Sequence, residues 1–332
     1  MIPFEYRTPK NLKEVNATLQ EFGSDAKLIA GGTALVIMMK QRLVRPSCLV
    51  SLRSVRGLNA IELKNGGISI GGLATHREVE GSSLIRRRLP MLAETYHHVA
   101  TLRIRNMATV GGGLAHADPN QDPPPSLIAL GATIKATSVN GSRMIPLDEF
   151  FKDYYESVLA QDEIITEVIV PKLAPNTGAA YIKFLPRTAD DYATVSAAAV
   201  LTLDKTKKTI ADVRIALGSV GVTPIRATAA EAVLRGQPLK ADGFAEAGEK
   251  AKEAVDPVSD FRGSAAYKKD MAAVFVRRAL EKALADIRQQ SKAKAAPKPK
   301  PAKKKTAKNG KRRGKLARLH RFPWPVSRCG IF

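Results

Sequence analysis

Cysteine is nearly absent from this chain of 332 residues, which contains only Cys48 and Cys329. Two thiols cannot form a disulfide framework, a four-cysteine zinc site or an iron–sulfur cluster held by this chain alone. Their scarcity also fits a reducing compartment. We therefore expect a fold stabilised by its hydrophobic core, for which the hydrophobic content of 44% is sufficient.

The chain also lacks long apolar stretches. The longest lies near Val195–Leu203, which is far shorter than the roughly 20 residues that a membrane-spanning helix needs. The N-terminal sequence MIPFEYRTPKN has no apolar segment of the kind found in signal peptides. We therefore expect a cytoplasmic protein that does not bind membranes.

Acidic residues are missing from one region, residues 291–332, which contain fifteen Lys and Arg. Residues 1–290 contain 38 basic and 31 acidic residues, so most of the net charge of +22 belongs to this tail. The low-complexity stretch Lys292–Lys315 cannot bury enough apolar surface to offset the entropy of ordering, so we expect disorder. The tail is either an electrostatic contact for nucleic acid or an acidic partner, or a solvated extension without a binding role, which we favour.

Two common nucleotide-binding fingerprints are also missing. The sequence has no G-x-x-x-x-G-K-[ST] segment, which argues against a P-loop, and no G-x-G-x-x-G after a strand, which argues against a Rossmann site. It has instead two other glycine turns, AGGT at residues 30–33 and TVGGG at residues 109–113. Glycine allows a ligand to approach the backbone, and free N–H groups at a turn attract phosphate oxygens.

Two such turns from different parts of the chain could hold one diphosphate from both sides. Thr33 and Thr109 could add hydroxyl donors to the backbone N–H groups. The alternative is that both segments are ordinary tight turns. The sequence around the first turn predicts a strand at Ala26–Gly32 and then a helix at Thr33–Leu43, with Thr33 as its N-cap.

Hydrophobic periodicity and turn residues predict an α/β fold in several units. Strands and helices alternate in residues 1–47 and in 48–175, and paired strands followed by amphipathic helices occupy 176–290. The basic tail of residues 291–332 is expected to follow these units.

Polar residues follow the second glycine turn, but they do not form a convincing metal site. His116, Asp118 and Asp122 are too few and too close together in sequence for a metal centre. A carboxylate that accepts hydrogen bonds from a ligand hydroxyl is more plausible, and Asp122 is our candidate. No Ser/His/Asp or Cys/His spacing indicates a nucleophile, so we predict no catalytic residue and no metal ligand.

The two turns in context resemble a known family. The segments LIAGGTALVIMMKQRLVRP and RIRNMATVGGGLAHADPNQDPPPSLIALGA are similar to the FAD-binding medium subunit of the molybdenum hydroxylases, which include aerobic carbon monoxide dehydrogenase and xanthine dehydrogenase. The resemblance covers about Met1 to Ile287, with both motifs in family order and spacing. GGISIGGLATHREVE and RGSAAYKKDMAAVFVRRALEKA also fit the family, whereas the basic tail lies outside it.

The resemblance implies a fold of the α/β (α+β) class. Residues 1–175 would form an FAD-binding region of the vanillyl-alcohol oxidase (PCMH) type, with subdomains at about 1–47 and 48–175. Residues 176–290 would form a smaller C-terminal α/β domain like that of carbon monoxide dehydrogenase flavoproteins.

The resemblance also implies which residues contact FAD. Those in the two turns surround the diphosphate, and the others lie near the ribityl chain and the flavin ring. They are Leu28, Ile29, Ala30, Gly31, Gly32, Thr33, Ala34, Leu35, Ala100, Thr109, Val110, Gly111, Gly112, Gly113, Asp122, Lys183 and Tyr192. The chain departs from the common pattern at Ala34 and Gly113, where the family often has polar residues.

The implied function is electron transfer. A large molybdopterin subunit would oxidise the substrate and a small subunit would relay electrons through two [2Fe–2S] clusters. FAD in this chain would pass them to an external acceptor, within an (LMS)2-type hetero-oligomer of large, medium and small subunits. Two cysteines exclude the branch of the family with an extra iron–sulfur cluster in this subunit. Two alternatives stay open, a flavin-independent interaction protein that uses its polybasic tail and a stand-alone flavin oxidase.

Overall fold

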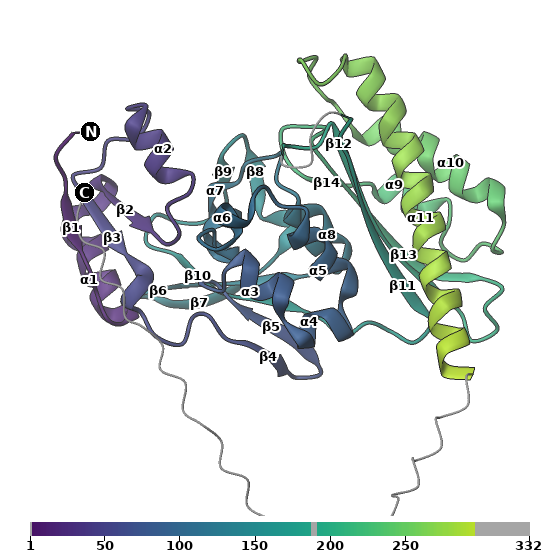
Figure 1. Ribbon diagram of the computed structural model, residues 1–332, viewed down its shortest axis with the longest axis horizontal. Helices are drawn as coiled ribbons and strands as arrows, with labels where there is room; N and C mark the ends of the chain where they lie inside the picture. The colour runs from purple at the N-terminus through teal and green to yellow at the C-terminus, as the bar shows by residue number, and fades with distance from the viewer. Residues whose placement is uncertain (1, 187–190, 296–332) are drawn as a thin grey trace, which may run out of the picture. The chain divides into compact units, whose positions relative to one another are not determined.

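Three sheets carry most of the fold in the computed structural model, which describes residues 2–186 and 191–295 (Figure 1). The first sheet and its helices comprise β1 (Glu5–Arg7), α1 (Leu12–Phe22), η1 (Gly23–Asp25), β2 (Ala26–Ile29), α2 (Leu35–Lys40), β3 (Cys48–Ser51) and η2 (Leu52–Ser54). The second comprises β4 (Ile61–Lys64), β5 (Gly67–Gly71), α3 (His76–Gly81), α4 (Ser83–Arg88), α5 (Pro90–His97), α6 (Leu102–Arg105), α7 (Val110–His116), α8 (Pro123–Ala129), β6 (Thr133–Ser138), β7 (Gly141–Pro146), η3 (Leu147–Glu149) and β10 (Ile164–Val170), with a small hairpin of β8 (Phe151–Asp153) and β9 (Glu156–Ser157). The third comprises β11 (Thr177–Phe184), β12 (Val195–Leu203), β13 (Ile210–Gly218), β14 (Ile225–Arg226), α9 (Thr228–Ala232), α10 (Ala241–Ala251), η4 (Lys252–Ala254) and α11 (Ala265–Ala295).

The first sheet is parallel and has the strand order β1-β3-β2. Its central strand, β3, pairs with both neighbours, so that Cys48 lies opposite Glu5 on one side and Ala26 on the other. Strand β3 begins just after the subdomain boundary expected at about residue 47, and it forms the centre of this sheet. Helix α1 covers the sheet and buries Val15 and Leu19 against it.

The second sheet is antiparallel and has the order β4-β5-β10-β6-β7. Its central strand, β10, is the last of the five in sequence and pairs with β5 and β6. Large apolar side chains from this sheet and from helices α3, α4, α5, α7 and α8 share one core, as Ile70, Leu92 and Ile134 illustrate. This arrangement places the N-terminal end of α7, which carries the second glycine turn, beside β10.

The third sheet is antiparallel, with the order β11-β12-β13-β14, and is covered on both faces. In β12, Ala197 and Ala199 belong to the core shared with α9, α10 and α11, whereas Ala198 and Val200 belong to the core shared with the second sheet. This alternation follows from the period of two in a strand. Helix α8 lies against β12 and β13, and all seven of its residues are buried.

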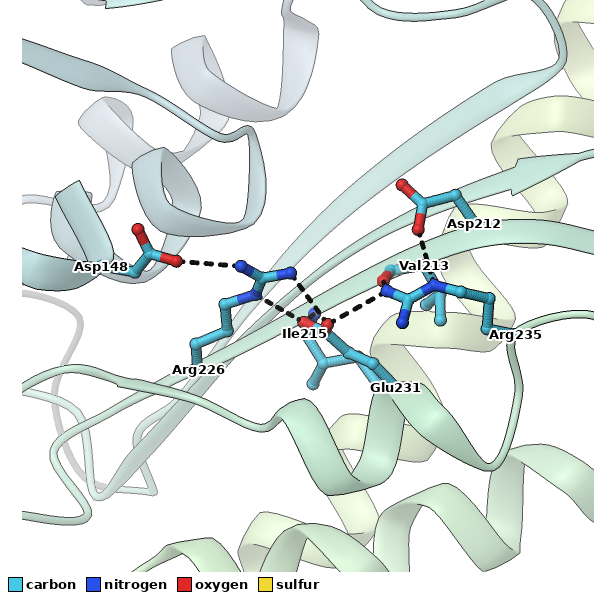
Figure 2. A network of polar contacts seen from close by, with 7 residues as sticks. All are labelled: Asp148, Asp212, Val213, Ile215, Arg226, Glu231 and Arg235. Atoms are coloured by element: carbon cyan, nitrogen blue, oxygen red, sulfur yellow. Dashed lines mark hydrogen bonds and ion pairs between the residues drawn. The ribbon is translucent and has the colours of Figure 1, made fainter. Parts of the chain in front are cut away.

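A polar network around a buried carboxylate also connects the second and third sheets (Figure 2). Glu231 is only 1% exposed, and its two oxygens accept hydrogen bonds from the backbone N–H of Ile215 and from the guanidinium groups of Arg226 and Arg235. Arg226 also donates to Asp148 in η3 at 2.9 Å. One arginine therefore connects the third sheet with a segment of the second.

Two element boundaries differ from those that the sequence predicts. Helix α2 begins at Leu35 with Ala34 as its N-cap, so Thr33 does not cap it. Helix α11 continues to Ala295, so residues 291–295 are helical and do not belong to the expected disordered tail. The rest of that tail lies outside the described residues. None of the helices within the described residues is long and apolar enough to cross a membrane.

Candidate functional site

A cleft of about 580 Å³ is lined by segments attached to all three sheets. This volume lies within the range of roughly 300–1,000 Å³ typical of small-molecule sites. Its wall includes every FAD-contact residue expected from the resemblance except Val110, which is buried beneath the second turn. The cleft therefore brings together residues from Leu28 to Tyr192, although their contacts with a cofactor stay a prediction.

The backbone of the first glycine turn packs closely against the segment between α6 and α7. A Cβ at Gly31 would lie 1.9 Å from the carbonyl oxygen of Met107, so that no larger residue fits there. Gly32 has a φ of +72°, which also favours glycine. Within the described residues, the backbone N–H groups of residues 31–35 donate no hydrogen bond. A run of free N–H groups suits anionic oxygens such as those of a diphosphate.

The second glycine turn differs from this pattern. The N–H groups of Val110 and Gly111 donate to the carbonyls of Ala74 and Gly72, and those of Gly112 and Gly113 donate to Thr109. Thr109 is thus the N-cap of α7, and this turn does not supply the free donors that the sequence suggested. It supplies bare backbone to the cleft wall.

The two turns face each other across the cleft. A Cβ at Gly112 would lie 2.7 Å from the hydroxyl oxygen of Thr109 and 3.7 Å from the Cβ of Ala30 in the first turn. Any side chain at Gly112 would therefore occupy the space between the turns. We infer that glycine is needed here for the approach of a ligand.

A buried ion pair lies on another part of the cleft wall. Lys183 of β11 donates to Oδ2 of Asp122 at 2.9 Å, and their side chains are 4% and 5% exposed. Tyr181 donates its hydroxyl to Oδ1 of Asp122 at 2.6 Å. Burial raises the pKa of Asp122, although the charge of Lys183 and both hydrogen bonds oppose the shift. Each carboxylate oxygen keeps a further lone pair, so Asp122 can still accept from a ligand hydroxyl.

An exposed aromatic ring borders the cleft near this ion pair. Tyr192 is 43% exposed and donates its hydroxyl to Asp118 at 2.7 Å. The guanidinium carbon of Arg262 lies 5.7 Å from the centre of the ring. Burial of the hydroxyl and the charge of Asp118 raise the pKa of Tyr192, so it stays protonated. Its ring can stack on a planar ligand.

Sequence reasoning did not assign His76 to the site, although it lies on the cleft wall. Its side chain is buried, and burial lowers the pKa of His76 to about 4, so that the imidazole is neutral near pH 7. The signal in the sequence was the capping box THRE, in which Thr75 and Glu78 exchange hydrogen bonds and start α3. That pattern predicts a helix start but does not show that the helix begins at a ligand site.

These features fit FAD, which is a diphosphate joined to a planar flavin. The first turn offers N–H donors for phosphate oxygens, and Gly112 keeps the gap between the turns open. Lys183 supplies a positive charge and Tyr192 supplies an aromatic ring on the same cleft.

Comparison with known proteins agrees with this assignment. Residues 2–173 match the family described as "FAD binding domain in molybdopterin dehydrogenase", and residues 180–283 match the "CO dehydrogenase flavoprotein C-terminal domain". The chain is 37% identical to the carbon monoxide dehydrogenase medium chain of Hydrogenophaga pseudoflava over 86% of this chain and 99% of that one. It is 38% identical to the 6-hydroxypseudooxynicotine dehydrogenase complex subunit alpha of Paenarthrobacter nicotinovorans over 85% and 94% of the two chains.

A solved structure extends the match to three dimensions. It is that of carbon monoxide dehydrogenase from Hydrogenophaga pseudoflava lacking the Mo-pyranopterin moiety of the molybdenum cofactor. One of its chains superposes with a TM-score of 0.82 at 38% identity, over 86% of this chain and 99% of that chain. Both the FAD-binding region and the C-terminal domain are thus accounted for. The chain therefore belongs to the family of FAD-binding medium subunits of the molybdenum hydroxylases.

Proposed function

We propose that this chain binds FAD in the cleft and serves as the flavoprotein subunit of a molybdenum-containing hydroxylase or dehydrogenase complex. In this role it passes electrons from the [2Fe–2S] clusters of a partner subunit to an external acceptor. The observation that carries the proposal is the pair of glycine turns, which face each other at Gly112 and Ala30 across one cleft. The free N–H groups of residues 31–35 on one side of that gap support a diphosphate ligand.

The residues of the cleft bind and orient the cofactor, and FAD supplies the electron-transfer chemistry when it is bound. The N–H groups of residues 31–35 hold the diphosphate, and Thr109 holds the first turn of α7 in place. Lys183 presents a buried positive charge to the flavin, fixed in position by Asp122. Tyr192 would offer its aromatic ring to the flavin.

The partners follow from the family. The names of the relatives, "medium chain" and "complex subunit", describe parts of larger assemblies. We propose a molybdopterin-binding large subunit that oxidises the substrate and a small subunit that carries the [2Fe–2S] clusters. An (LMS)2-type hetero-oligomer is the assembly that we expect, and its mass in solution is the measurement that tests it.

The first experiment is an absorption spectrum of the full-length chain after incubation with FAD and gel filtration. Flavin bands at roughly 370 and 450 nm, together with an FAD mass after acid release, would support the proposal. Failure to retain FAD at saturating concentration would contradict it. Molybdenum and iron in the complex purified from its source would separate a complex subunit from a stand-alone flavin oxidase, which would contain neither.

A further inference from the structure

The cleft wall includes a short loop, residues 98–100, with an unusual backbone. Ala100 has a φ of +38°, in the left-handed region that residues other than glycine seldom adopt. Such a conformation is strained and persists only when surrounding contacts impose it. Both Val99 and Ala100 lie on the wall of the cleft.

Two buried cations hold the three consecutive carbonyl groups of this loop. Lys183 donates to the carbonyl oxygen of His98 at 3.0 Å. Arg105 of α6 donates through one nitrogen, Nη1, to the carbonyl oxygens of Val99 and Ala100, both at 2.8 Å. Charged donors, which make the stronger class of hydrogen bond, thus hold all three carbonyl groups of the loop.

A buried carboxylate in turn holds Arg105. Nε of Arg105 donates to Oε2 of Glu80 at 3.1 Å, and Glu80 is 4% exposed. His97 and Arg77 contact the other oxygen of Glu80, each at 2.9 Å. Burial alone would raise the pKa of Glu80, but the hydrogen bonds from His97 and Arg77 and the charge of Arg105 lower it to about 2, so the carboxylate is ionised.

The same conformation leaves donors unused on the loop. Within the described residues, the backbone N–H groups of Ala100 and Thr101 donate no hydrogen bond. Since the carbonyls of residues 98–100 are all engaged by cations, Ala100 can present its N–H group to an acceptor in the cleft. Flavin rings carry carbonyl and ring-nitrogen acceptors, and hydrogen bonds to them are a main way in which proteins adjust a flavin.

We propose that Arg105, oriented by Glu80, is a positioning residue that holds residues 98–100 in the conformation that receives the flavin portion of FAD. This proposal rests on the proposed function, because it assigns these residues to the same cofactor. Neither residue belongs to the glycine turns, so the adenosine diphosphate portion of FAD should not depend on them.

The test compares two probes, FAD and ADP, on the full-length chain by titration calorimetry. Arg105→Lys keeps the charge but loses the planar fork that reaches two carbonyls and a carboxylate at once. If the substitution reduces the fraction of molecules with a competent loop to about one tenth, the Kd for FAD rises about tenfold. The Kd for ADP should stay within about twofold. Glu80→Gln should act in the same direction.

A matched control is available on the same short helix. Arg103 is exposed on α6, so Arg103→Lys should leave both affinities unchanged. The visible absorption spectrum of bound FAD gives a second readout, because a displaced loop changes the surroundings of the flavin. Arg105→Lys should shift that spectrum, and Arg103→Lys should not.

Two results would overturn the proposal. Equal FAD affinity and spectrum in Arg105→Lys and the wild type would show that the loop does not need Arg105. Equal losses of FAD and ADP affinity would show a general structural role. If Arg105→Lys does not fold, Glu80→Gln decides by the same criteria. If the wild-type chain binds no FAD at all, the proposed function itself fails, which is a different outcome.

Discussion

The buried ion pair of Lys183 and Asp122 offers a sharp test of the site. We consider Lys183→Met, which keeps the length of the side chain and removes its charge. Asp122 would then stay buried, with the hydroxyl of Tyr181 as its remaining side-chain partner. The side chains of the pair are only 4% and 5% exposed, so little water is available to solvate the carboxylate after the cation is lost.

The expected cost follows from this burial. Removing one partner of a buried ion pair typically lowers the free energy of unfolding by about 3–5 kcal/mol. With an unfolding entropy of about 2.1 cal/mol/K per residue, roughly 0.6 kcal/mol/K for the 290 described residues, this cost corresponds to a fall in Tm of about 5–8 °C. Lys64→Met is the control, since Lys64 is 45% exposed in its pair with Glu167, and its loss should lower the free energy of unfolding much less.

The loss of stability caused by Lys183→Met should depend on pH. The pKa of Asp122 is already raised by burial, and loss of Lys183 raises it further. A carboxyl group with a raised pKa in the folded state contributes stability below its unfolded pKa and loses it as pH rises through the folded pKa. The free energy of unfolding that Lys183→Met loses relative to the wild type should therefore be smaller at about pH 5 than at about pH 8.

Thermal and urea unfolding of the full-length chain without FAD measure this deficit separately from cofactor binding. The double variant Lys183→Met/Asp122→Asn should recover most of the loss, because no buried charge is left unpaired. A single variant with wild-type stability at pH 8, or a double variant no better than the single one, would refute the reasoning. Either result would mean that Asp122 finds solvent or another cation.

Three further outcomes are expected. Gly112→Ala should weaken FAD binding about tenfold or more, because its methyl group would lie on the cleft wall only 2.7 Å from the hydroxyl oxygen of Thr109, and this contact would displace the cap of α7. Gly81→Ala is the control, because its methyl group would meet no atom within 4 Å and Gly81 does not line the cleft, so it should bind FAD normally. Glu231→Gln should lower the free energy of unfolding by about 3 kcal/mol in urea titrations, and Asp148→Asn, at the more exposed end of the same network, by at most about 1 kcal/mol. Burial lowers the pKa of His76 from 6.5 to about 4, so between these pH values the unfolded chain binds more protons than the folded chain. The free energy of unfolding should therefore fall by up to ~3 kcal/mol as pH falls from 6.5 to 4. His76→Leu should make the free energy of unfolding less dependent on pH in this range.

Local patterns in the sequence predicted the position of the two glycine turns well. The first turn separates β2 from α2 and the second turn begins α7, so the glycines at residues 30–33 and 109–113 locate both turns without knowledge of the fold. Both turns line one cleft, as the hypothesis of a two-sided grip on a diphosphate requires.

Hydrogen bonding at the second turn was not predictable from that pattern. The acceptors for Val110 and Gly111 are the carbonyls of Ala74 and Gly72, more than thirty residues earlier in the chain. Only the packing of α7 beside β5 and β10 brings them together. Free and occupied glycine N–H groups look the same in a sequence.

Long-range pairing explains the remaining differences. The pairing of Cys48–Ser51 with two strands that precede it was not predictable from the sequence, because parallel pairing leaves no local turn signal. Glu80 and Arg105 are separated by 25 positions, and each lies among other charged residues that suggest a solvated surface. Their burial depends on contacts between α3 and α6, which the charge pattern does not reveal.

The packing of helix α8 makes the two family segments of this chain depend on each other. Its sequence, PPPSLIA, belongs to the FAD-binding family region, yet it is buried from both sides, partly by β12 and β13. The same region contains Asp122, whose cation and hydroxyl partner both come from β11. Residues 2–173 alone would expose the apolar helix α8 and would leave Asp122 without its partners from β11. The two family segments are separate in sequence comparison, but we therefore expect that neither folds on its own. Gene fusions or domain exchanges in this family would have to carry both segments together.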